Sequence, residues 1–264
     1  SLPSILWHME FPFGRPSILS NFLVAKEVKK HVTVAYTGEG SDELFGGYNR
    51  YLIFKNNDSS LSIDKKIESI PSSFFTTKQD KENYFSSKLL QSESEDTKPI
   101  SAFKKLVKVN QDYEFLNQVL LFELKTEIPG AQTWRIDRAG SAHALELREP
   151  FLDYELVEFA SSIPASFKIN MDNGIKKKYI LQKLAKKYLP KQIAERKKFP
   201  WGIPYYDYFI NEFIPIAECI LDKSIIMKRD YLNLNKHSLK NIFSSVLKTK
   251  DKNITSKDVE INDK

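Results

Sequence analysis

A short segment of the chain places three carboxylates among glycines. It covers residues 37–48 and reads TGEGSDELFGGY, so that Glu39, Asp42 and Glu43 lie within five residues. These carboxylates would repel a polyphosphate that carries no cation. They suit a hard cation, however, and protein-bound Mg²⁺ usually joins the phosphates of a nucleotide to one or two carboxylates. The glycines let the backbone turn tightly and approach a ligand closely. The spacing therefore indicates a site for a metal–nucleotide complex.

Helix capping is an alternative explanation for the same carboxylates. A helical pattern begins at Ser41, which is a suitable N-cap residue, and the helix dipole favours Asp42 and Glu43 in the first turn. Capping does not explain Glu39, which lies before the helix between two glycines. The residue pattern alone leaves both interpretations open.

A predicted strand positions this segment. Residues 31–36 read HVTVAY and are apolar or β-branched at nearly every position, which is typical of a strand buried on both faces of a parallel sheet. The carboxylates follow its carboxyl end, where open α/β sheets bind their ligands.

The rest of the pattern is mainly helical. Residues 5–13 form an apolar segment that ends in a proline-containing turn, and residues 57–97 are polar and predict loops with one exposed helix. Helices are expected over residues 19–30, 98–128, 138–147, 154–162, 175–188, 205–220 and 238–248. We therefore predict an α/β fold with one or two strands of a parallel sheet, followed by a mainly helical C-terminal region. Residues 1–249 would form this domain, and residues 250–264 a polar, flexible tail.

Composition limits the classes of protein. The chain has 264 residues, of which 41% are hydrophobic and 28% charged, as in an ordinary globular domain. Its single cysteine, Cys219, excludes a disulfide framework within the chain and favours a reducing, cytoplasmic setting. No apolar run is long enough for a membrane helix, so we expect no membrane partner.

The net charge of +6 is compatible with anionic ligands, including nucleotides and nucleic acid. Much of it comes from the lysine-rich run over residues 176–198. That run also has an amphipathic helical pattern, and it lacks the interleaved aromatic residues that base stacking requires. We therefore do not expect nucleic acid to be a partner.

Four blocks in order resemble the glutamine-hydrolysing asparagine synthetase family. Residues 37–48 are similar to the family signature [ST]-G-E-G-x-D-E-L-x-x-G-Y, and residues 7–13, WHMEFPF, resemble the segment before the same strand. Residues 137–153, DRAGSAHALELREPFLD, are similar to D-R-x-x-x-A-H-x-L-E-x-R-x-P-F-L-D. Residues 196–198 with residues 202–204 resemble R-x-K-x-x-x-G-x-P. The resemblance implies the C-terminal, ATP-pyrophosphatase-type domain, with a partial sheet like that of the adenine nucleotide hydrolases.

The resemblance also implies a reaction. Family members activate a carboxylate with ATP and Mg²⁺, form an acyl-adenylate and release pyrophosphate, after which ammonia from glutamine gives the amide. By this resemblance Thr37 and Gly38 contact ATP. Glu39 helps to form and resolve the adenylate, and Asp42 binds the Mg²⁺ that accompanies pyrophosphate.

Two lysines complete the implied site. Lys198 aligns with the lysine that neutralises charge on the leaving pyrophosphate, and a lysine suits a phosphate group whose geometry changes. Lys178 matches a second family lysine that precedes an Ile-Leu pair, and we assign it to nucleotide binding. Without the surrounding motif, either residue would be read as a solvated lysine of a basic stretch.

The acceptor acid follows from the branch of the superfamily. The related β-lactam synthetases carry tyrosine at the position of Glu39, so a carboxylate there favours amide formation, with aspartate as the expected acceptor. Arg15 and Glu149 depart from the family pattern, as does the Glu10-Phe11 pair in place of two acidic residues. The alternatives are a relative that amidates another acid in a tailoring pathway, and a non-catalytic binding remnant. The joint presence of Glu39, Asp42 and Lys198 argues against the remnant.

Further charged residues occupy the third block. We interpret Asp137, Arg138, Glu146 and Arg148 as structural ion pairs beneath the site. His143 is expected to be a packed histidine, and Asp153 to cap the next helix.

Two parts of the family's machinery are not found within these residues: a Ser-Gly-Gly-x-Asp-Ser pyrophosphate loop and the glutaminase domain with its terminal cysteine. We therefore expect the chain to be truncated at its N-terminal side, with ammonia supplied by a glutaminase domain outside it. We further expect little or no activity from the isolated chain. ATP–pyrophosphate exchange with aspartate tests this, and a rate typical of a complete synthetase would contradict it.

Overall fold

The computed structural model describes residues 2–10, 15, 17–54, 62, 65, 81–83, 85–91, 99–110, 112–172 and 174–196. The chain divides into two compact units. The first comprises residues 1–63 and 106–203, and the second comprises residues 64–105 and 204–264. None of the described helices combines the length and apolar character needed to cross a membrane.

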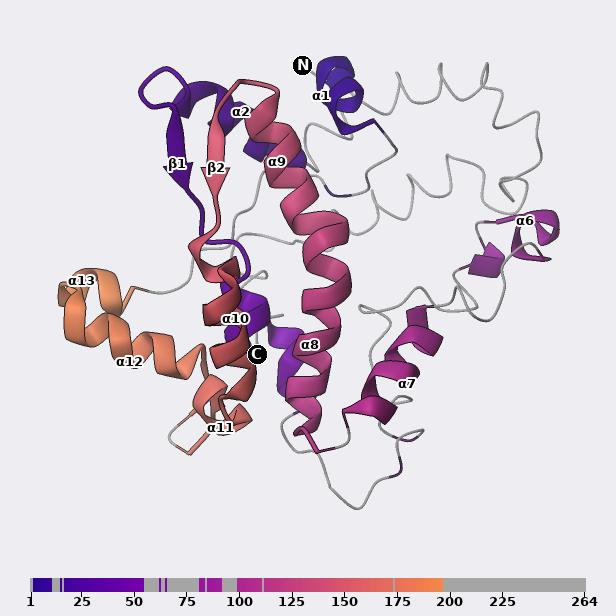
Figure 1. Cartoon of the computed structure of the whole chain (residues 1–264), viewed down its shortest axis with the longest axis vertical. Coiled ribbons are helices and arrows are strands. Elements are labelled where there is room, and N and C mark those ends of the chain that lie inside the picture. Colours follow the sequence, from indigo (N-terminus) through magenta and orange to yellow (C-terminus); the bar gives the residue numbers. More distant parts are fainter. Residues whose placement is uncertain are drawn as a thin grey trace, which may run out of the picture. The chain divides into compact units, whose positions relative to one another are not determined.

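A two-stranded parallel sheet organises the first unit. Strand β1 (Val34–Tyr36) pairs with β2 (Glu146–Arg148), and Ala35 lies opposite Leu147 (Figure 1). The ladder extends by one hydrogen bond at each end, from the Glu146 amide to the Thr33 carbonyl and from the Thr37 amide to the Arg148 carbonyl. With helices making up most of the rest, the α/β fold class predicted from the sequence is confirmed.

The predicted burial of this strand on both faces is wrong. Val34 is 40% exposed and Tyr36 is 74% exposed, whereas Ala35 between them is half-buried. Within the described residues β1 has one neighbouring strand, and Ala35 and Leu147 pack on the helical core of one face. The side chains on the opposite face are therefore left open.

The location of the second strand was not predicted. The sequence indicated a helix over residues 138–147, but helix α9 (Thr133–Ser141) ends before Ala144, which has a left-handed φ of 54°. The Leu145 amide then returns to the Gly140 carbonyl at 3.0 Å and closes the helix end. Residues 146–148 alternate polar, apolar and polar, and their exposure alternates in the same way, as expected of a strand with one covered face.

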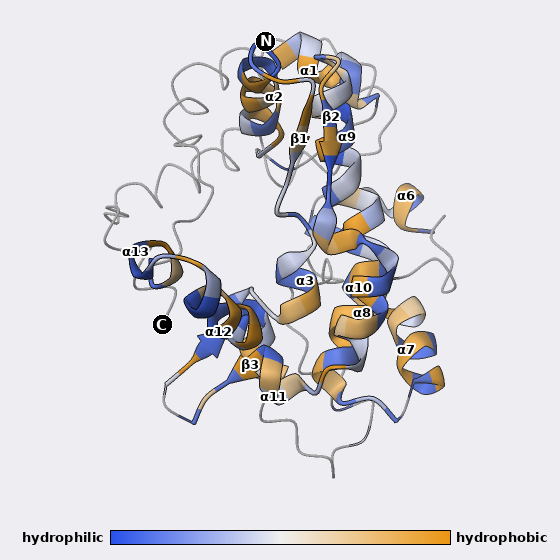
Figure 2. Cartoon of the chain, turned by 60° about the vertical axis from the view of Figure 1, so that its left-hand side comes forward, coloured by the Kyte–Doolittle hydropathy of each residue, from blue (hydrophilic) through white to orange (hydrophobic). Residues whose placement is uncertain are grey.

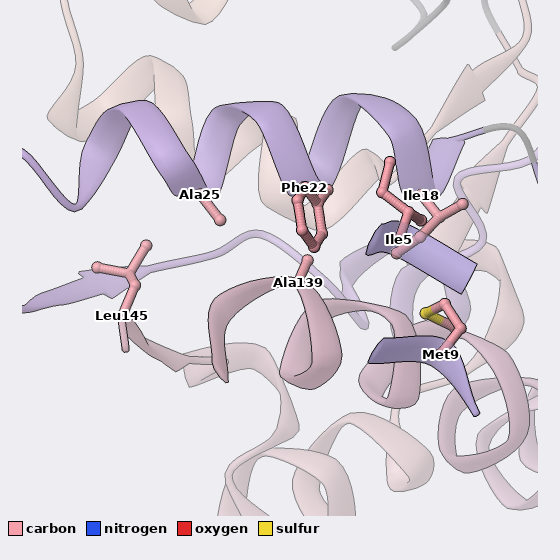
Figure 3. Close-up of a cluster of buried hydrophobic side chains, with 7 residues drawn as sticks. All are labelled: Ile5, Met9, Ile18, Phe22, Ala25, Ala139 and Leu145. Atoms are coloured by element: carbon pink, nitrogen blue, oxygen red, sulfur yellow. The ribbon is translucent and has the colours of Figure 1, made fainter. Parts of the chain in front are cut away.

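Helices α1 (Leu2–Met9) and α2 (Ser17–Val28) pack with α9 to form the main core of this unit. The helix predicted over residues 19–30 corresponds to α2. Figure 3 shows the buried apolar side chains that these three helices and the residue before β2 bring together: Ile5, Met9, Ile18, Phe22, Ala25, Ala139 and Leu145. This core fixes α9 beside the sheet.

The predicted helix over residues 98–128 is two helices, α7 (Pro99–Val109) and α8 (Phe115–Glu127). The Asn110 side chain donates to the Leu106 carbonyl at 2.7 Å, which satisfies the end of α7. Helix α8 continues into α9 through a π-helical segment, Ile128–Gln132, so that the three form one long helix (Figure 1). Pro129 within the π segment has no amide hydrogen to donate, which accounts for a local break in the α-helical pattern.

Short helical elements follow each strand of the parallel sheet along the chain. The chain forms two 3-10 turns, η1 (Asn49–Phe54) and η4 (Pro150–Leu152), and helices α3 (Ser41–Phe45), α10 (Tyr154–Ser162) and α11 (Ala165–Lys168). The predicted helix over residues 154–162 and its Asp153 cap are confirmed, since the Asp153 carboxylate accepts from the amides of Glu155 and Leu156. Leu44 and Phe45 of α3 pack with Ala160 and Ile163 in a second core.

The lysine-rich run begins in a short hairpin. Strand β3 (Ile169–Asn170) pairs antiparallel with β4 (Lys176–Lys177), and helix α12 (Tyr179–Tyr188) follows, then α13 (Lys191–Ala194). The helix predicted over residues 175–188 therefore starts later, because residues 176–177 pair with β3. Helix α12 carries polar and apolar residues around its circumference (Figure 2).

In the second unit the structure describes α6 (Ser87–Gln91), the larger part of α7 and a few neighbouring residues. Helix α6 has no buried residue and corresponds to the exposed helix predicted within residues 57–97. The helices predicted over residues 205–220 and 238–248, the tail at 250–264 and Cys219 lie outside the described residues.

Candidate active site

The turn after β1 is built around a glycine. Gly40 has a left-handed φ of 85° and is the N-cap of α3, so the prediction that Ser41 is the N-cap is wrong. A Cβ atom at Gly40 would overlap the side chain of Leu152, which excludes larger residues there. Ser41 is instead the first helical residue, and its hydroxyl donates to the Gly38 carbonyl at 2.9 Å. This bond closes the turn that carries Glu39.

Glu39 is bound to a buried arginine. Oε1 of Glu39 lies 3.0 Å from Nη2 of Arg135 on α9. The Arg135 side chain is 8% exposed and that of Glu39 is 24% exposed. Glu39 is therefore oriented from the interior while part of its carboxylate stays accessible.

Asp42 and Lys178 form a second charged pair beside the same turn. Lys178 Nζ lies 3.0 Å from Asp42 Oδ1 and donates to the Ser41 hydroxyl at 2.8 Å. Lys178 has a left-handed φ of 50°, an uncommon conformation for a lysine, immediately before α12. The structure thus brings together Ser41, Asp42 and Lys178, although the last two were assigned to different ligands.

Gly47 makes the close approach of this pair possible. A Cβ atom at Gly47 would overlap both Oδ1 of Asp42 and Cε of Lys178. We expect Gly47→Ala to displace the pair, to lower the free energy of unfolding by about 1–3 kcal/mol, as overpacking does, and to weaken binding of Mg-ATP. Urea unfolding and calorimetric titration with Mg-ATP measure the two effects.

Gly130→Ala is the matched control for this substitution. Gly130 lies in the π-helical segment, and no atom of the residues that the structure describes comes within 4 Å of a Cβ built there. Alanine there should leave nucleotide binding unchanged and should not lower stability, since glycine is the poorer helix former. Equal losses in the two variants would show that Gly47 has no special relation to the pair.

Thr37 and Gly38 lie at the entrance of the turn. Oγ1 of Thr37 is buried and has no hydrogen-bond partner among the described residues. Among the described residues no atom lies within 4 Å of a Cβ built at Gly38, so the space that they leave in front of it is open. A free hydroxyl beside an open backbone suits a polar ligand, in keeping with the nucleotide contact predicted for these residues.

Glu43 is the most deeply buried of the three carboxylates, at 1% exposure. Its Oε1 accepts a hydrogen bond of 2.8 Å from the Tyr48 hydroxyl. Burial raises the pKa of Glu43 above its ordinary value, and burial likewise raises the pKa of Tyr48, which keeps that hydroxyl protonated. Glu43 therefore faces the interior and not a solvent-accessible metal ion.

A pH dependence follows from the raised pKa of Glu43. The folded state holds this proton more tightly than the unfolded state, so the stabilisation is complete below the unfolded pKa of about 4.5 and is lost as pH rises through the folded pKa. Glutamine at this position cannot titrate. The stability of Glu43→Gln relative to the parent should therefore increase from pH 4.5 to pH 8 in urea titrations. A difference that stays constant with pH would contradict the raised pKa.

The buried network continues from Glu43 toward α8. Glu123 accepts from Arg50 at 2.8 Å and from the Tyr51 hydroxyl, and the Arg50 guanidinium stacks 4.3 Å from the centre of the Tyr48 ring. Burial raises the pKa of Glu123, although the bonds from Arg50 and Tyr51 oppose the shift. The network ties η1 to the helix that leads to Arg135.

A cavity of about 660 Å³ opens along α9 and β2. Asp137, Glu146 and Glu149 contribute its carboxylates. Burial, reinforced by the charges of Glu39 and Asp137, raises the pKa of Glu149. Glu149 therefore lies close enough to Glu39 for their charges to interact.

The ion pairs predicted for the third block involve Arg138, Glu146 and Arg148, whereas Asp137 lines the cavity. Arg138 contacts Glu10 at 2.9 Å and stacks on the Trp134 ring, while Arg148 contacts Glu146 at 2.7 Å. His143 is packed, as predicted: its ring lies edge-on to Phe22 with 4.4 Å between centres, and burial lowers its pKa.

One predicted position is not described, and two residues of the site were missed. Lys198 lies outside the described residues, so its place relative to Glu39 and Asp42 stays a prediction. Sequence reasoning missed Arg135 and Gln132, which precede the third block. Their i, i+3 spacing on a helix that leads into Asp137 was the available signal.

The donors around Asp42 bear on the predicted Mg²⁺. The described residues contain no group of three or more His, Cys, Asp or Glu side chains arranged to hold a metal ion. Asp42 is partly exposed and lies beside the Ser41 hydroxyl, and Mg²⁺ that accompanies a nucleotide needs only one or two protein carboxylates. The donor set thus fits a metal bound mainly through phosphate and water.

Comparisons with known proteins agree with the motif blocks. The family model described as asparagine synthase matches residues 1–258. Asparagine synthetase (glutamine-hydrolyzing) 1 of Bacillus subtilis is 31% identical over 255 residues, which cover 84% of this chain and 39% of that protein. A putative asparagine synthetase (glutamine-hydrolyzing) of Mycobacterium tuberculosis is 26% identical over 232 residues, or 77% of this chain and 35% of that protein. The chain thus spans two fifths or less of the length of these relatives.

Proposed function

Because the chain belongs to the asparagine synthase family, we propose that it takes part in ATP-dependent amidation of a carboxylic acid through an acyl-adenylate. Aspartate is the proposed acceptor and asparagine the product, with ammonia released from glutamine by a glutaminase domain outside these 264 residues. The observation that carries the proposal is the meeting of two charged pairs, Glu39 with Arg135 and Asp42 with Lys178, at the turn after β1.

The Asp42–Lys178 pair serves the first step of the reaction in this proposal. The acceptor carboxylate attacks the α-phosphate of ATP, an acyl–phosphate bond forms, and the bond to the β-phosphate breaks so that pyrophosphate leaves. Lys178 would offset phosphate charge, and Lys198 is proposed for the same role. Thr37 and Gly38 would contact the nucleotide. Asp42 would hold Mg²⁺, which when bound supplies positive charge to the leaving pyrophosphate.

Glu39 serves the second step in this proposal. Ammonia attacks the acyl carbon, AMP leaves, and the nitrogen must lose a proton for a neutral amide to form. The accessible part of the Glu39 carboxylate would accept that proton, while Arg135 holds its other side. General base catalysis requires such a fixed acceptor within reach of the nitrogen.

The setting proposed for this reaction is the cytoplasm. The single cysteine, Cys219, requires no oxidising compartment, and ATP is abundant there.

A second candidate is the amidation of a different acid. Glu149 stands where the family usually has valine, and its charge interacts with that of Glu39. An added carboxylate beside the site would disfavour a dicarboxylate acceptor relative to an acid that carries fewer negative charges or an extra amine.

The test is ATP–pyrophosphate exchange by the natural gene product that contains these residues, with a panel of acids. Exchange that requires aspartate, together with asparagine formed from glutamine, would support the main proposal. Exchange with another acid but not with aspartate would favour the second candidate. Nucleotide binding without exchange for any acid would support a non-catalytic role.

A further inference from the structure

Arg135 is a buried cation held by three elements of the first unit. Nη2 contacts Glu39 after β1 and the side-chain carbonyl of Gln132, and Nη1 donates to the Ser17 hydroxyl at the start of α2 at 3.0 Å. A guanidinium removed from water needs such partners, because burying an unpaired charge is strongly unfavourable. The fork of donors fixes the direction in which Glu39 is held.

The π-helical segment provides one of these partners. Gln132 is its last residue, and the Thr133 hydroxyl donates to the Ile128 carbonyl, five residues back, at 3.0 Å. The side-chain Nε2 of Gln132 donates to Oε1 of Glu127 at 3.3 Å, and Glu127 in turn pairs with Arg15 at 2.6 Å. π-Helical turns within α-helices often occur at functional sites. Here Gln132 at the end of this segment contacts Arg135 in the first turn of α9, which also binds Glu39.

We infer that Arg135 is the positioning residue for Glu39, and that Gln132 and Ser17 fix Arg135 for this task. The inference rests on the proposed function, in which Glu39 accepts the proton from the reacting nitrogen. Arg135 binds Oε1, and within the described residues Oε2 accepts no hydrogen bond, so Oε2 is the oxygen left for the reacting nitrogen. Arg135 would not touch substrate. It acts by keeping a partly exposed carboxylate in one orientation.

A double-mutant cycle in the natural gene product tests this inference. Arg135→Lys keeps the charge but removes the fork, and it should lower kcat for asparagine formation by about 10- to 100-fold, as small misplacements of catalytic groups do. The KM for ATP should not change. In a Glu39→Gln background the same Arg135→Lys change should have no further effect on kcat, because the group it positions is already disabled. Lys30→Gln, which removes an exposed ion pair with Glu27, is the control and should leave kcat unchanged.

Gln132→Met gives a second, milder probe that leaves Arg135 in place. It should also lower kcat, again without a change in the KM for ATP. Losses from Arg135→Lys and Glu39→Gln that multiply independently would overturn the inference, as would a rise in the KM for ATP with kcat unchanged.

Thermal unfolding of the parent, Arg135→Lys, Glu39→Gln and the double variant separates this inference from the proposed function. If the contact exists, the changes in Tm of the two single variants should not add in the double variant. A parent protein without any amidation activity would overturn the proposed function and with it the positioning of Glu39 for catalysis, even if the Tm values showed coupling. An active parent with independent effects on kcat would overturn only the positioning role.

Discussion

Replacing Glu39 with glutamine should reduce the rate of amide formation by about 10²–10⁴-fold, the usual contribution of a positioned general base. Glutamine keeps the shape of the side chain and an oxygen that can accept from Arg135. It loses the ability to take a proton. Binding of Mg-ATP should not change, because Asp42, Lys178 and the backbone of the turn remain in place. Single-turnover formation of asparagine and calorimetric titration with Mg-ATP measure the two quantities.

The stability of this variant has to be measured alongside its activity. Arg135 loses its charged partner in Glu39→Gln but keeps Gln132 and Ser17, so a modest decrease in Tm is expected. Glu39→Asp retains the charge and shortens the side chain, and it should recover part of the rate if charge is what matters. A Glu39→Gln enzyme with the rate of the parent would rule out Glu39 as the proton acceptor.

The sequence was informative about the site wherever the signal was local. The strand that ends at Tyr36, the glycine-rich turn and the helix over residues 154–162 with its Asp153 cap each depend on neighbouring residues. Such signals arise from side-chain alternation, backbone freedom and capping, all of which act within a few positions. The N-cap of α3 was nevertheless predicted one residue too late. The left-handed φ of Gly40 made that glycine the N-cap in place of Ser41.

The parts that could not be predicted depend on contacts between distant segments. Arg135 meets Glu39 across 96 residues, and Lys178 meets Ser41 across 137 residues. Residues 146–148 form a strand by pairing with β1, and their helical propensity does not outweigh that pairing. Periodicity contains no information on such partners. Pattern reasoning could therefore locate the site on the chain without identifying the cation that orients Glu39.

Removing Arg50 is expected to have the largest effect on stability. Glu123 is 5% exposed and Arg50 is 25% exposed, so Arg50→Met leaves a nearly buried carboxylate without its counter-charge. Breaking a buried pair in this way costs about 3–5 kcal/mol, and the partial exposure of Arg50 places the expected loss near the lower end. Loss of the stacking of Arg50 on Tyr48 acts in the same direction. Urea unfolding followed by circular dichroism measures the change.

The loss caused by Arg50→Met should depend on pH. Burial already raises the pKa of Glu123, and without Arg50 the carboxyl holds its proton more tightly still in the folded state. A protonated Glu123 needs no counter-charge, so the difference between parent and variant should be small in acid and should increase as pH rises toward neutrality. The exposed pair of Lys186 and Glu195 provides a comparison, and Lys186→Ala should produce no measurable change.

The double variant Arg50→Met with Glu123→Leu distinguishes a lost attraction from a stranded charge. If most of the cost comes from the unpaired Glu123, removing that carboxylate as well should make the double variant more stable than Arg50→Met alone, because apolar replacements of buried pairs are often neutral or stabilising. Tyr51 would then keep a hydroxyl without its acceptor, at about 1–3 kcal/mol, and Tyr51→Phe in the same background should recover this amount. A double variant less stable than Arg50→Met would instead mean that the remaining bond from Tyr51 to Glu123 holds η1 against α8, so that the network and not the ion pair alone maintains the support beneath the site.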